Sequence, residues 1–427
     1  MGKKRYLIVG NSAAGLSAAR SIRFSDPSGK ILILTVEDGP AYSRIMLPLF
    51  IAGQVSKEEM ILAPESFYRE NKIEIKTGAK VLSVDPSGRY VIMESGETVS
   101  YDELLLATGA DPYFPSVEGI HLPGVHALRT LKDAKEILGT LSHLQGEAVI
   151  YGGGLVGLKC LEALPKRMGR IRLIVSSSQI LSQVLDRAAA EIIQEKLEIE
   201  GIRVHLQTDV QACQGNGSLK RVVLSSGQEI PCGLMIVAKG VVSNMRMIEG
   251  TPLRAEDGIL VDKWMATGVP GVYAAGDVCQ PDDLLTGRKR QFPIWPLAVE
   301  EGRIAGANMA GSPQAFSGAM RMNALELFGL KVISLGVIES QPNMLAESQS
   351  RRDGGGYRKV IFSGSRLKGC ILLGEISGAG VIEGLIRSQQ EVDGNLIQKI
   401  VEGNILYSHR LRSWPANKTN FSLRSLR

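Results

Sequence analysis

The chain contains 427 residues with a formal net charge of +5, and 44% of its residues are hydrophobic and 22% charged. Such a composition is typical of a globular chain with ample material for a core, and it excludes an intrinsically disordered or disulfide-stapled chain. The 48 glycines exceed the usual share of about 7%, but they show no three-residue period, which excludes a collagen-like chain.

The charge balance, 49 basic against 44 acidic residues, is too even over this length to indicate nucleic-acid binding. Basic residues gather at both ends of the chain, where two interpretations stay open: solvated termini, or a surface that docks an acidic protein partner. These residues are Lys3, Lys4, Arg5, Arg410, Arg412, Arg424 and Arg427.

The cysteines and histidines show no metal-binding pattern. Five cysteines are an odd number and include no C-x-x-C pair, which indicates buried free thiols in a reducing interior. The five histidines are scattered, so we expect no metal site. The residues are Cys160, Cys213, Cys232, Cys279 and Cys370, with His121, His126, His143, His205 and His409.

The N-terminal segment is not typical of a signal peptide. Its apolar run, Tyr6 to Val9, stops at Gly10, whereas a signal core needs about 7–15 apolar residues. No segment approaches the roughly 18 apolar residues of a membrane span. We therefore expect a cytoplasmic protein without a membrane span.

A strand, a glycine turn and a helix are predicted in the first 22 residues. The strand ends at Gly10, which permits a tight turn, and Gly15 lets the helix approach the strand closely. Ser12 stands where such turns usually carry a second glycine. The start of the helix would offer unpaired N–H groups to a pyrophosphate, and its residues there are Ala13, Ala14 and Gly15.

An acidic residue follows the next predicted strand, which runs from Ile31 to Thr35. A carboxylate at this distance from the glycine turn can accept hydrogen bonds from the ribose hydroxyls of an adenosine. Glu37 is the candidate, although Thr35 stands where that acid more often falls.

The same pattern returns at residues 148–157, where G-x-G-x-x-G is complete. Two such turns, each preceded by an apolar strand, predict two dinucleotide sites. The residues expected at the second site are Gly152, Gly154, Leu155, Val156 and Gly157.

The second unit lacks the acid that selects an unphosphorylated ribose. Its next predicted strand, residues 171–175, ends with Val175 at the acid position, and three serines follow. The hydroxyls of Ser176 and Ser177 could donate to a phosphate, which makes NADPH more plausible. No arginine follows directly, so the choice between NADH and NADPH stays open.

Three further apolar segments end in glycine. Residues 101–110 form a predicted strand that ends at Thr108 and Gly109, and residues 222–241 form a predicted return strand with Gly240 near its end. Residues 271–277 end at Gly276 and Asp277, where the carboxylate could accept a hydrogen bond from a ribityl hydroxyl or could cap a helix.

These segments, in this order, resemble the two-dinucleotide-binding flavoproteins, the FAD- and NAD(P)H-dependent reductases of the pyridine nucleotide-disulfide type. The resemblance implies that the first turn binds FAD and the second binds NAD(P)H. Residues 42–48 are similar to the family's Y-S-R-P-x-L-S stretch beside the flavin, which implies a positive charge from Arg44 near the flavin or its phosphates. Residues 295–303 are similar to the W-P-x-A-x-x-Q-G-R helix at the flavin pyrimidine edge, which implies FAD contacts from Trp295, Pro296 and Ala298.

The resemblance is nearest to rubredoxin reductases, ferredoxin reductases and the flavin part of assimilatory-type nitrite reductases, and the chain departs from the family pattern at two places. Residues 36–60 contain no cysteine, which disfavours disulfide reduction because that chemistry needs a thiolate beside the flavin. Ferredoxin-reductase-like members often pair a lysine with a glutamate where this chain has Leu49 and Lys159. Lys159 could tune the flavin electrostatically or extend to solvent, and Cys160 and Cys279 are expected to be inert buried thiols.

The resemblance implies an α/β fold with two Rossmann-like dinucleotide-binding domains, one inserted in the other, and a C-terminal α+β domain that forms a homodimer. The FAD domain would span 1–113 and 246–318, the NAD(P)H domain 114–245 and the C-terminal domain 319–427. In the last domain, residues 320–337 and 357–374 are predicted strands, residues 349–357 a hairpin or loop, and residues from Gly380 to Ile386 the start of a helix. About twenty polar and basic residues end the chain.

The resemblance further implies an FAD-dependent NAD(P)H oxidoreductase. A hydride would pass from the nicotinamide to flavin N5, and electrons would then pass to a ferredoxin, a rubredoxin or a similar iron–sulfur protein; no side chain is expected to do the chemistry itself. One alternative is an NAD(P)H oxidase or small-molecule reductase. The other is a flavin-binding subunit that has lost nicotinamide binding, an idea motivated by Val175 and Lys159.

Overall fold

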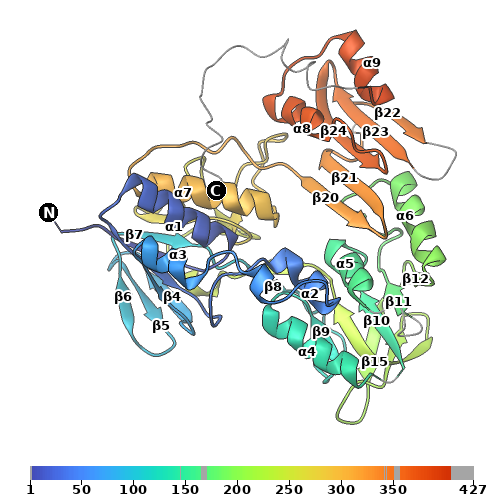
Figure 1. Ribbon diagram of the computed structural model, residues 1–427, viewed down its shortest axis with the longest axis horizontal. Coiled ribbons are helices and arrows are strands. Elements are labelled where there is room, and N and C mark those ends of the chain that lie inside the picture. The colour runs from blue at the N-terminus through green and yellow to red at the C-terminus, as the bar shows by residue number, and fades with distance from the viewer. Residues whose placement is uncertain are drawn as a thin grey trace. The chain divides into compact units, whose positions relative to one another are not determined.

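The computed structural model describes residues 2–144, 146–164, 171–340, 342, 344–350 and 356–404. The chain divides into two compact units, Met1–Arg321 and Met322–Arg427. The units are described one at a time below, with the elements labelled as in Figure 1.

The first sheet of the N-terminal unit has five strands, all parallel, in the order β18-β7-β1-β2-β3. Four of the five β1 residues are buried, as expected for a parallel strand that is covered on both faces. The strands are β1 (Arg5–Val9), β2 (Lys30–Leu34), β3 (Ile73–Lys76), β7 (Glu103–Leu106) and β18 (Val272–Ala274).

Two helices, α1 (Ala13–Ser25) and α7 (Trp295–Met309), lie side by side against this sheet (Figure 1). Their backbones approach closely because both helices carry small residues four positions apart. A Cβ atom added to Gly302 would lie 2.1 Å from the carbonyl oxygen of Ala14, and one added to Gly306 would lie 2.4 Å from that of Ala18. Residues from distant parts of the chain therefore form one helix pair.

Shorter elements surround this layer. Residues 81–100 form an antiparallel meander, and a two-stranded ribbon joins β8 to β16. The elements are β4 (Val81–Asp85), β5 (Tyr90–Met93), β6 (Thr98–Ser100), β8 (Ala110–Pro112), β16 (Val241–Ser243), β17 (Ile259–Leu260), β19 (Cys279–Gln280), α2 (Leu47–Ile51), α3 (Glu65–Glu70), and the 3-10 turns η1 (Arg44–Met46), η2 (Glu58–Met60) and η4 (Arg246–Ile248).

The second sheet runs in the order β12-β11-β10-β15-β14-β13, with β9 also paired to β15. Strands β9, β10, β11, β12 and β15 are parallel, and β13 and β14 are antiparallel additions. The strands are β9 (Val125–Ala127), β10 (Glu147–Tyr151), β11 (Ile171–Ile174), β12 (Arg203–His205), β13 (Val210–Gln214), β14 (Arg221–Leu224) and β15 (Glu229–Val237), and the helices are α4 (Leu131–Ser142), α5 (Leu155–Ala163) and α6 (Arg187–Ile199).

The expectation of a single return strand over residues 222–241 was wrong. The segment forms a hairpin of β14 and β15, and only β15 returns beside β10. Gly227, with φ +81°, permits the turn between them. The polar run from Ser225 to Gln228 separates the two strands, and the expectation of one strand overlooked this turn signal.

The C-terminal unit is an antiparallel five-stranded sheet in the order β20-β21-β24-β23-β22, with two helices. Residues 320–337 and 357–374, expected as strands, each form a hairpin. The strands are β20 (Met322–Leu327), β21 (Leu330–Gly336), β22 (Leu345–Ser350), β23 (Tyr357–Ser363) and β24 (Arg366–Leu373), and the helices are α8 (Ala379–Ser388) and α9 (Gly394–Glu402). Most of the expected loop, residues 351–355, and the basic C-terminal segment, residues 405–427, lie outside the described residues.

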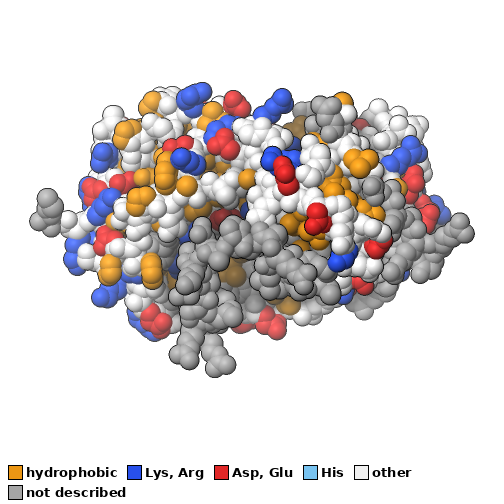
Figure 2. Space-filling view, turned by 90° about the horizontal axis from the view of Figure 1, so that it is seen from above, with side chains coloured by type: hydrophobic (Ala, Val, Ile, Leu, Met, Phe, Trp, Pro, Cys, Tyr) orange, Lys and Arg blue, Asp and Glu red, His pale blue; other side chains and the backbone are white. Residues whose placement is uncertain are grey.

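Charged side chains of both signs are interspersed with hydrophobic ones on the face shown in Figure 2. Two of the basic N-terminal residues are engaged within the unit, since Lys4 pairs with Glu103 and Arg5 with Asp102, each at 2.8 Å. Among the described helices, none combines the length and apolar character that crossing a membrane requires.

Candidate functional site

The two glycine turns have the same local geometry. Gly10 follows β1 with φ +120°, and a Cβ atom there would lie 2.1 Å from the carbonyl oxygen of Ala107. Gly152 follows β10 with φ +130°, and a Cβ atom there would lie 2.2 Å from the carbonyl oxygen of Ala238. Both positions therefore exclude any side chain.

The glycines at the helix starts bring α1 and α5 directly onto these turns. A Cβ atom on Gly15 would lie 1.9 Å from the carbonyl oxygen of Gly10, and one on Gly157 would lie 2.0 Å from that of Gly152. The backbone at each turn can therefore approach a ligand that lies at the helix end.

Both helices begin without a side-chain cap. Ser12 precedes α1 and Gly154 precedes α5, neither side chain caps its helix, and neither first turn contains an acidic residue. By contrast, Thr130 and Asp133 form a capping box at α4, and Asp186 caps α6. The first N–H groups of α1 and α5, in the turns of Ala13 to Gly15 and Leu155 to Gly157, have no partner within the helix, so both ends can bind an anion.

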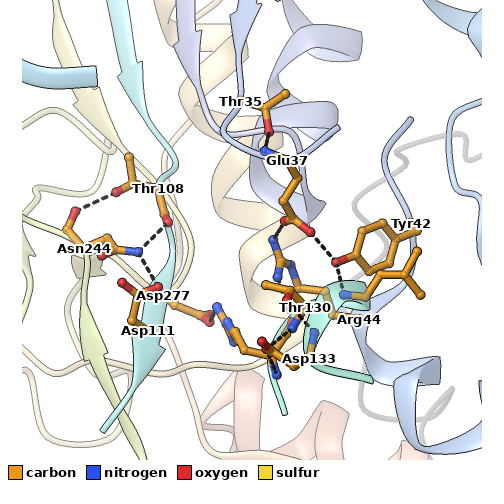
Figure 3. A network of polar contacts seen from close by, with 12 residues as sticks. Thr35, Glu37, Tyr42, Arg44, Thr108, Asp111, Thr130, Asp133, Asn244 and Asp277 are labelled. Atoms are coloured by element: carbon orange, nitrogen blue, oxygen red, sulfur yellow. Dashed lines mark hydrogen bonds and ion pairs between the residues drawn. The ribbon is translucent and has the colours of Figure 1, made fainter. Parts of the chain in front are cut away.

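A small pocket lies beside the first turn. Its lining includes Glu37, whose carboxylate forms an ion pair with Arg44 and accepts a hydrogen bond from the Tyr42 hydroxyl (Figure 3). Burial is the main cause that raises the pKa of Tyr42 above its ordinary value, so this hydroxyl remains a donor. The full lining is Asn11, Ser12, Thr35, Glu37, Gly39, Pro40, Ala41, Tyr42 and Arg44.

Arg129 joins three of the predicted segments, and the sequence patterns had not indicated it. Its guanidinium donates to Asp277 at 2.7 Å, and its carbonyl oxygen accepts from Arg44 at 2.8 Å. A Cβ atom on Gly109 would lie 3.2 Å from the same guanidinium. The local signal was the Thr130-x-x-Asp133 capping box directly after it, which marks a helix start at this position.

Asp277 lies in a turn between β18 and β19, where no helix begins. The helix-cap interpretation of this residue was therefore wrong, and its carboxylate is held by Arg129 instead. Figure 3 shows the same region continuing to Thr108, whose hydroxyl donates to the Asn244 carbonyl oxygen at 2.8 Å. Asn244 in turn donates its backbone N–H to Gly109 at 2.9 Å.

Gly276 brings the start of α7 against the first turn. A Cβ atom on Gly276 would lie 3.2 Å from the Cβ atom of Ala14 and 3.5 Å from that of Ala298. The predicted residues Trp295 and Pro296 are the first two of α7. Three segments distant in sequence therefore meet at the carboxyl edge of the first sheet.

Glu301, one turn further along α7, is a buried acid with 2% of its surface exposed. Its Oε2 accepts the Gly276 N–H at 2.8 Å and lies 3.4 Å from the Cys279 sulfur. Burial is the main cause that raises the pKa of Glu301 to about 8. Glu301 is therefore protonated at neutral pH, and in this form its side chain accepts the hydrogen bond that holds the Gly276 turn.

At the second turn the serines face protein groups. The hydroxyl of Ser177 donates to the Gln179 carbonyl oxygen at 2.7 Å, and that of Ser176 donates to Asp209. Gly240, between β15 and β16, has φ +101°. Val175 is buried, and its methyl group would meet a Cβ atom on Gly153 at 2.8 Å.

Lys159 lies on α5 and forms an ion pair with Glu162, and one third of its side chain is exposed. Helix α5 contacts α2, the helix that carries Leu49. The two positions that differ from the family's lysine–glutamate pair therefore lie on neighbouring helices, while a flavin-tuning role for Lys159 stays a prediction.

All five cysteines are free and buried. Burial raises the pKa of Cys160 to about 12 and that of Cys279 well above its ordinary value, as expected for inert thiols. Within the described ranges, no three His, Cys, Asp or Glu side chains group as metal ligands would; His409 lies outside those ranges.

Two protein-family profiles match the chain: "Pyridine nucleotide-disulphide oxidoreductase" over residues 4–302 and "Rubredoxin NAD+ reductase C-terminal domain" over residues 322–390. The chain belongs to the pyridine nucleotide-disulphide oxidoreductase family. It is an oxidoreductase, and members of this family use FAD and NAD(P)H. The expected fold class, two Rossmann-like domains with a further C-terminal domain, is confirmed.

The relatives include enzymes and a subunit of an enzyme. The chain is 31% identical over 385 residues to the NADH-dependent phenylglyoxylate dehydrogenase subunit epsilon of Aromatoleum evansii, which covers 90% of this chain and 91% of that one. It is 30% identical over 308 residues to the rubredoxin-NAD(+) reductase of Pseudomonas putida, a match that covers 72% of this chain and 80% of that one. The solved ferredoxin reductase from Rhodopseudomonas palustris has the same fold, with a TM-score of 0.85, 21% identity, and coverage of 93% of this chain and all of that one.

The residues at the first turn fit FAD. The turn excludes a Cβ atom at Gly10, the first N–H groups of α1 are uncapped, and the adjoining pocket carries the carboxylate of Glu37. These are the groups that a pyrophosphate and a ribose require.

Proposed function

We propose that the chain is an FAD-dependent NAD(P)H oxidoreductase that passes electrons to a redox protein of the rubredoxin or iron–sulfur type. The observation that carries this proposal is the pair of identically built glycine turns, each followed by an uncapped helix. A chain with two such ends can hold two pyrophosphates, one for each nucleotide.

The first turn would hold FAD. In this assignment the N–H groups of α1 bind the pyrophosphate, Glu37 accepts hydrogen bonds from the adenosine ribose, and Asp277 accepts one from the ribityl chain. Arg129 orients Asp277, because it donates to that carboxylate at 2.7 Å. The start of α7, with Trp295, Pro296 and Ala298, covers the flavin edge.

The second turn would hold the nicotinamide nucleotide. The N–H groups of Leu155 to Gly157 bind its pyrophosphate, and the left-handed backbone of Gly240 lets the chain pass close to it. Bound FAD supplies the redox chemistry, since it accepts a hydride equivalent and releases electrons singly. The residues of the chain position the two nucleotides and exclude water around them.

A protein acceptor is favoured by the cysteines and by the relatives. Residues 36–60 contain no cysteine, and the five cysteines elsewhere are buried free thiols, so the chain offers no thiolate relay to a disulfide substrate. The similarity to rubredoxin-NAD(+) reductase, and the C-terminal profile of the same class, support a small redox protein as acceptor.

Anaerobic stopped-flow spectroscopy tests the proposal. NADH or NADPH should bleach the absorbance of the bound flavin, and rubredoxin or a [2Fe–2S] ferredoxin should restore it faster than oxygen does. Failure of both nucleotides to bleach the flavin would falsify the proposal. Reoxidation by oxygen alone would identify an NAD(P)H oxidase instead.

A second candidate is an electron-transfer subunit of a larger enzyme, because one relative that matches over nine tenths of both chains is a subunit. We also propose a homodimer formed through the C-terminal unit, whose profile match begins at residue 322. Light scattering of the purified holoprotein should give twice the mass of the 46.1 kDa chain. A mass of one chain would contradict the dimer.

A further inference from the structure

A polar cluster around Asp209 occupies the carboxyl edge of the second sheet. One oxygen of this residue, Oδ1, accepts hydrogen bonds from the Tyr151 hydroxyl at 2.8 Å and from the Ser176 hydroxyl, and lies 3.5 Å from the Lys239 ammonium. Tyr151 ends β10, Ser176 comes two residues after β11, and Lys239 comes two residues after β15. The carboxylate therefore contacts the ends of three neighbouring parallel strands.

These partners flank the second glycine turn on both sides. Tyr151 immediately precedes Gly152, and a Cβ atom on Gly152 would lie 3.3 Å from the backbone nitrogen of Lys239. On the other side, Val175, the residue before Ser176, lies against Gly153. Asp209 is therefore placed beside the turn assigned to the nicotinamide nucleotide.

The second carboxylate oxygen of Asp209, Oδ2, accepts no hydrogen bond from any described residue. The side chain is 51% exposed, whereas that of Lys239 is only 21% exposed and lies 4.6 Å from the centre of the Tyr151 ring. The carboxylate thus faces solvent, and the ammonium is turned inward against the cluster.

The cluster keeps this carboxylate ionised. Desolvation acts to raise the pKa of Asp209, but the hydrogen bonds from Ser176 and Tyr151 and the charge of Lys239 lower it below its ordinary value overall. The ionised Oδ2 at this edge of the sheet can therefore accept a hydrogen bond from a ligand.

We propose that Asp209 supplies the carboxylate that the second unit lacks at Val175, and that it selects NADH over NADPH. Its Oδ2 accepts a hydrogen bond from an adenosine ribose hydroxyl and repels a 2′-phosphate. Ser176, Tyr151 and Lys239 hold the carboxylate in position. This inference rests on the assignment of the second turn to the nicotinamide nucleotide.

The competing possibility is that Lys239 leaves the cluster and binds a 2′-phosphate, which would favour NADPH. The geometry weighs against this, because the Lys239 ammonium already contacts Ser176 and Asp209 and has the smaller exposure of the two charged groups. Moving the ammonium to a phosphate would break its contacts with both Ser176 and Asp209.

Calorimetry on the holoprotein with ADP-ribose and 2′-phospho-ADP-ribose tests the proposal, since neither ligand can reduce the flavin. Wild type should bind ADP-ribose at least 10-fold more tightly. Asp209→Asn should weaken ADP-ribose binding about 10-fold. The ratio of the affinities for ADP-ribose and 2′-phospho-ADP-ribose should fall at least 10-fold. Glu195→Gln, an exposed carboxylate on α6, is the matched control and should change neither affinity.

Lys239→Gln is the second variant, because Asp209→Asn also removes a partner of Lys239. It should keep the preference for ADP-ribose if Lys239 only supports the carboxylate. A wild-type preference for 2′-phospho-ADP-ribose that disappears in Lys239→Gln would overturn the proposal, as would an affinity ratio unchanged in Asp209→Asn. If neither ligand binds wild type, the nucleotide assignment of the second turn falls together with this inference.

Discussion

Arg129 and Asp277 are separated by 148 positions in the sequence, and the guanidinium of one donates to the carboxylate of the other at 2.7 Å. Their side chains are 24% and 16% exposed, so the ion pair is largely shielded from solvent and is formed without a bound cofactor. Through its carbonyl oxygen Arg129 also contacts Arg44, so one residue links the two ends of the proposed FAD site.

Removal of this guanidinium should weaken FAD binding. In Arg129→Ala, Asp277 loses a charged hydrogen bond, which is worth about 1.5–3 kcal/mol, so we expect the Kd for FAD to rise about 10- to 100-fold. The ratio of flavin to protein absorbance after gel filtration measures the loss. Arg187→Ala, at an exposed ion pair on α6, should keep its flavin, and equal retention by both variants would refute the role.

Substitution of one glycine at each turn should separate the binding of FAD from the binding of the nicotinamide nucleotide. Gly15→Ala places a Cβ atom 1.9 Å from a carbonyl oxygen at the first turn, and Gly157→Ala places one 2.0 Å from a carbonyl oxygen at the second. We expect the first variant to lose FAD, and the second to retain FAD but lose ADP-ribose binding, as measured by flavin absorbance and calorimetry.

The control is Gly139→Ala, in the interior of α4, where a Cβ atom would meet nothing within 4 Å. This change should stabilise the protein by about 0.5–1 kcal/mol, because alanine loses less backbone entropy in a helix. Loss of FAD from Gly157→Ala would contradict the separate assignment of the two turns.

Glu301 should make stability fall as the pH rises. Its pKa is about 8 in the folded chain against an ordinary value of 4.5, so between these values the folded state holds a proton that the unfolded state has lost. The free energy of unfolding then decreases with rising pH, by up to about 1.4 kcal/mol per pH unit from this group.

Glu301→Gln removes this titration and restores the residue of the W-P-x-A-x-x-Q-G-R motif. Its unfolding free energy should match that of wild type near pH 4.5 and exceed it at pH 8. Urea denaturation of both proteins across this pH range, in excess FAD, gives the comparison. Parallel pH profiles for the two proteins would show that Glu301 is ionised in the folded chain.

The cysteine thiols should be unreactive in the native protein. All five cysteines are buried, and burial raises the pKa of Cys160 and Cys370 to about 12. We expect an aromatic disulfide reagent to label fewer than one thiol per folded chain and all five after denaturation. A single thiol that reacts rapidly, and whose modification blocks turnover, would contradict this expectation and indicate that a cysteine takes part in electron transfer.

Local patterns in the sequence predicted the parts of the fold that depend on local geometry. The turns at Gly10 and Gly152 need a left-handed backbone, and only glycine adopts it at no cost, so they were visible as motifs. The hairpin of β14 and β15 was missed because the polar turn signal from Ser225 to Gln228 was read as part of one strand.

The partners of the predicted residues were not predictable in the same way. Arg129 and Asp209 act through contacts with segments far away in sequence, and no periodicity records which side chain will face them. Val175 indicated that an acid was missing, but only the folded sheet shows that Asp209 lies beside the same turn. A missing residue in a motif is therefore a reason to search the neighbouring strands.

The close contact between α1 and α7 has a consequence for the order in which the chain folds during synthesis. The ribosome releases β1 and α1 first, yet β18 and α7, which complete the same sheet and helix pair, emerge only after the whole second sheet. The second sheet spans residues 125–237 and can close while the first still lacks an edge strand and its covering helix. The proposed FAD site, which begins first in the sequence, would therefore be the last to be completed.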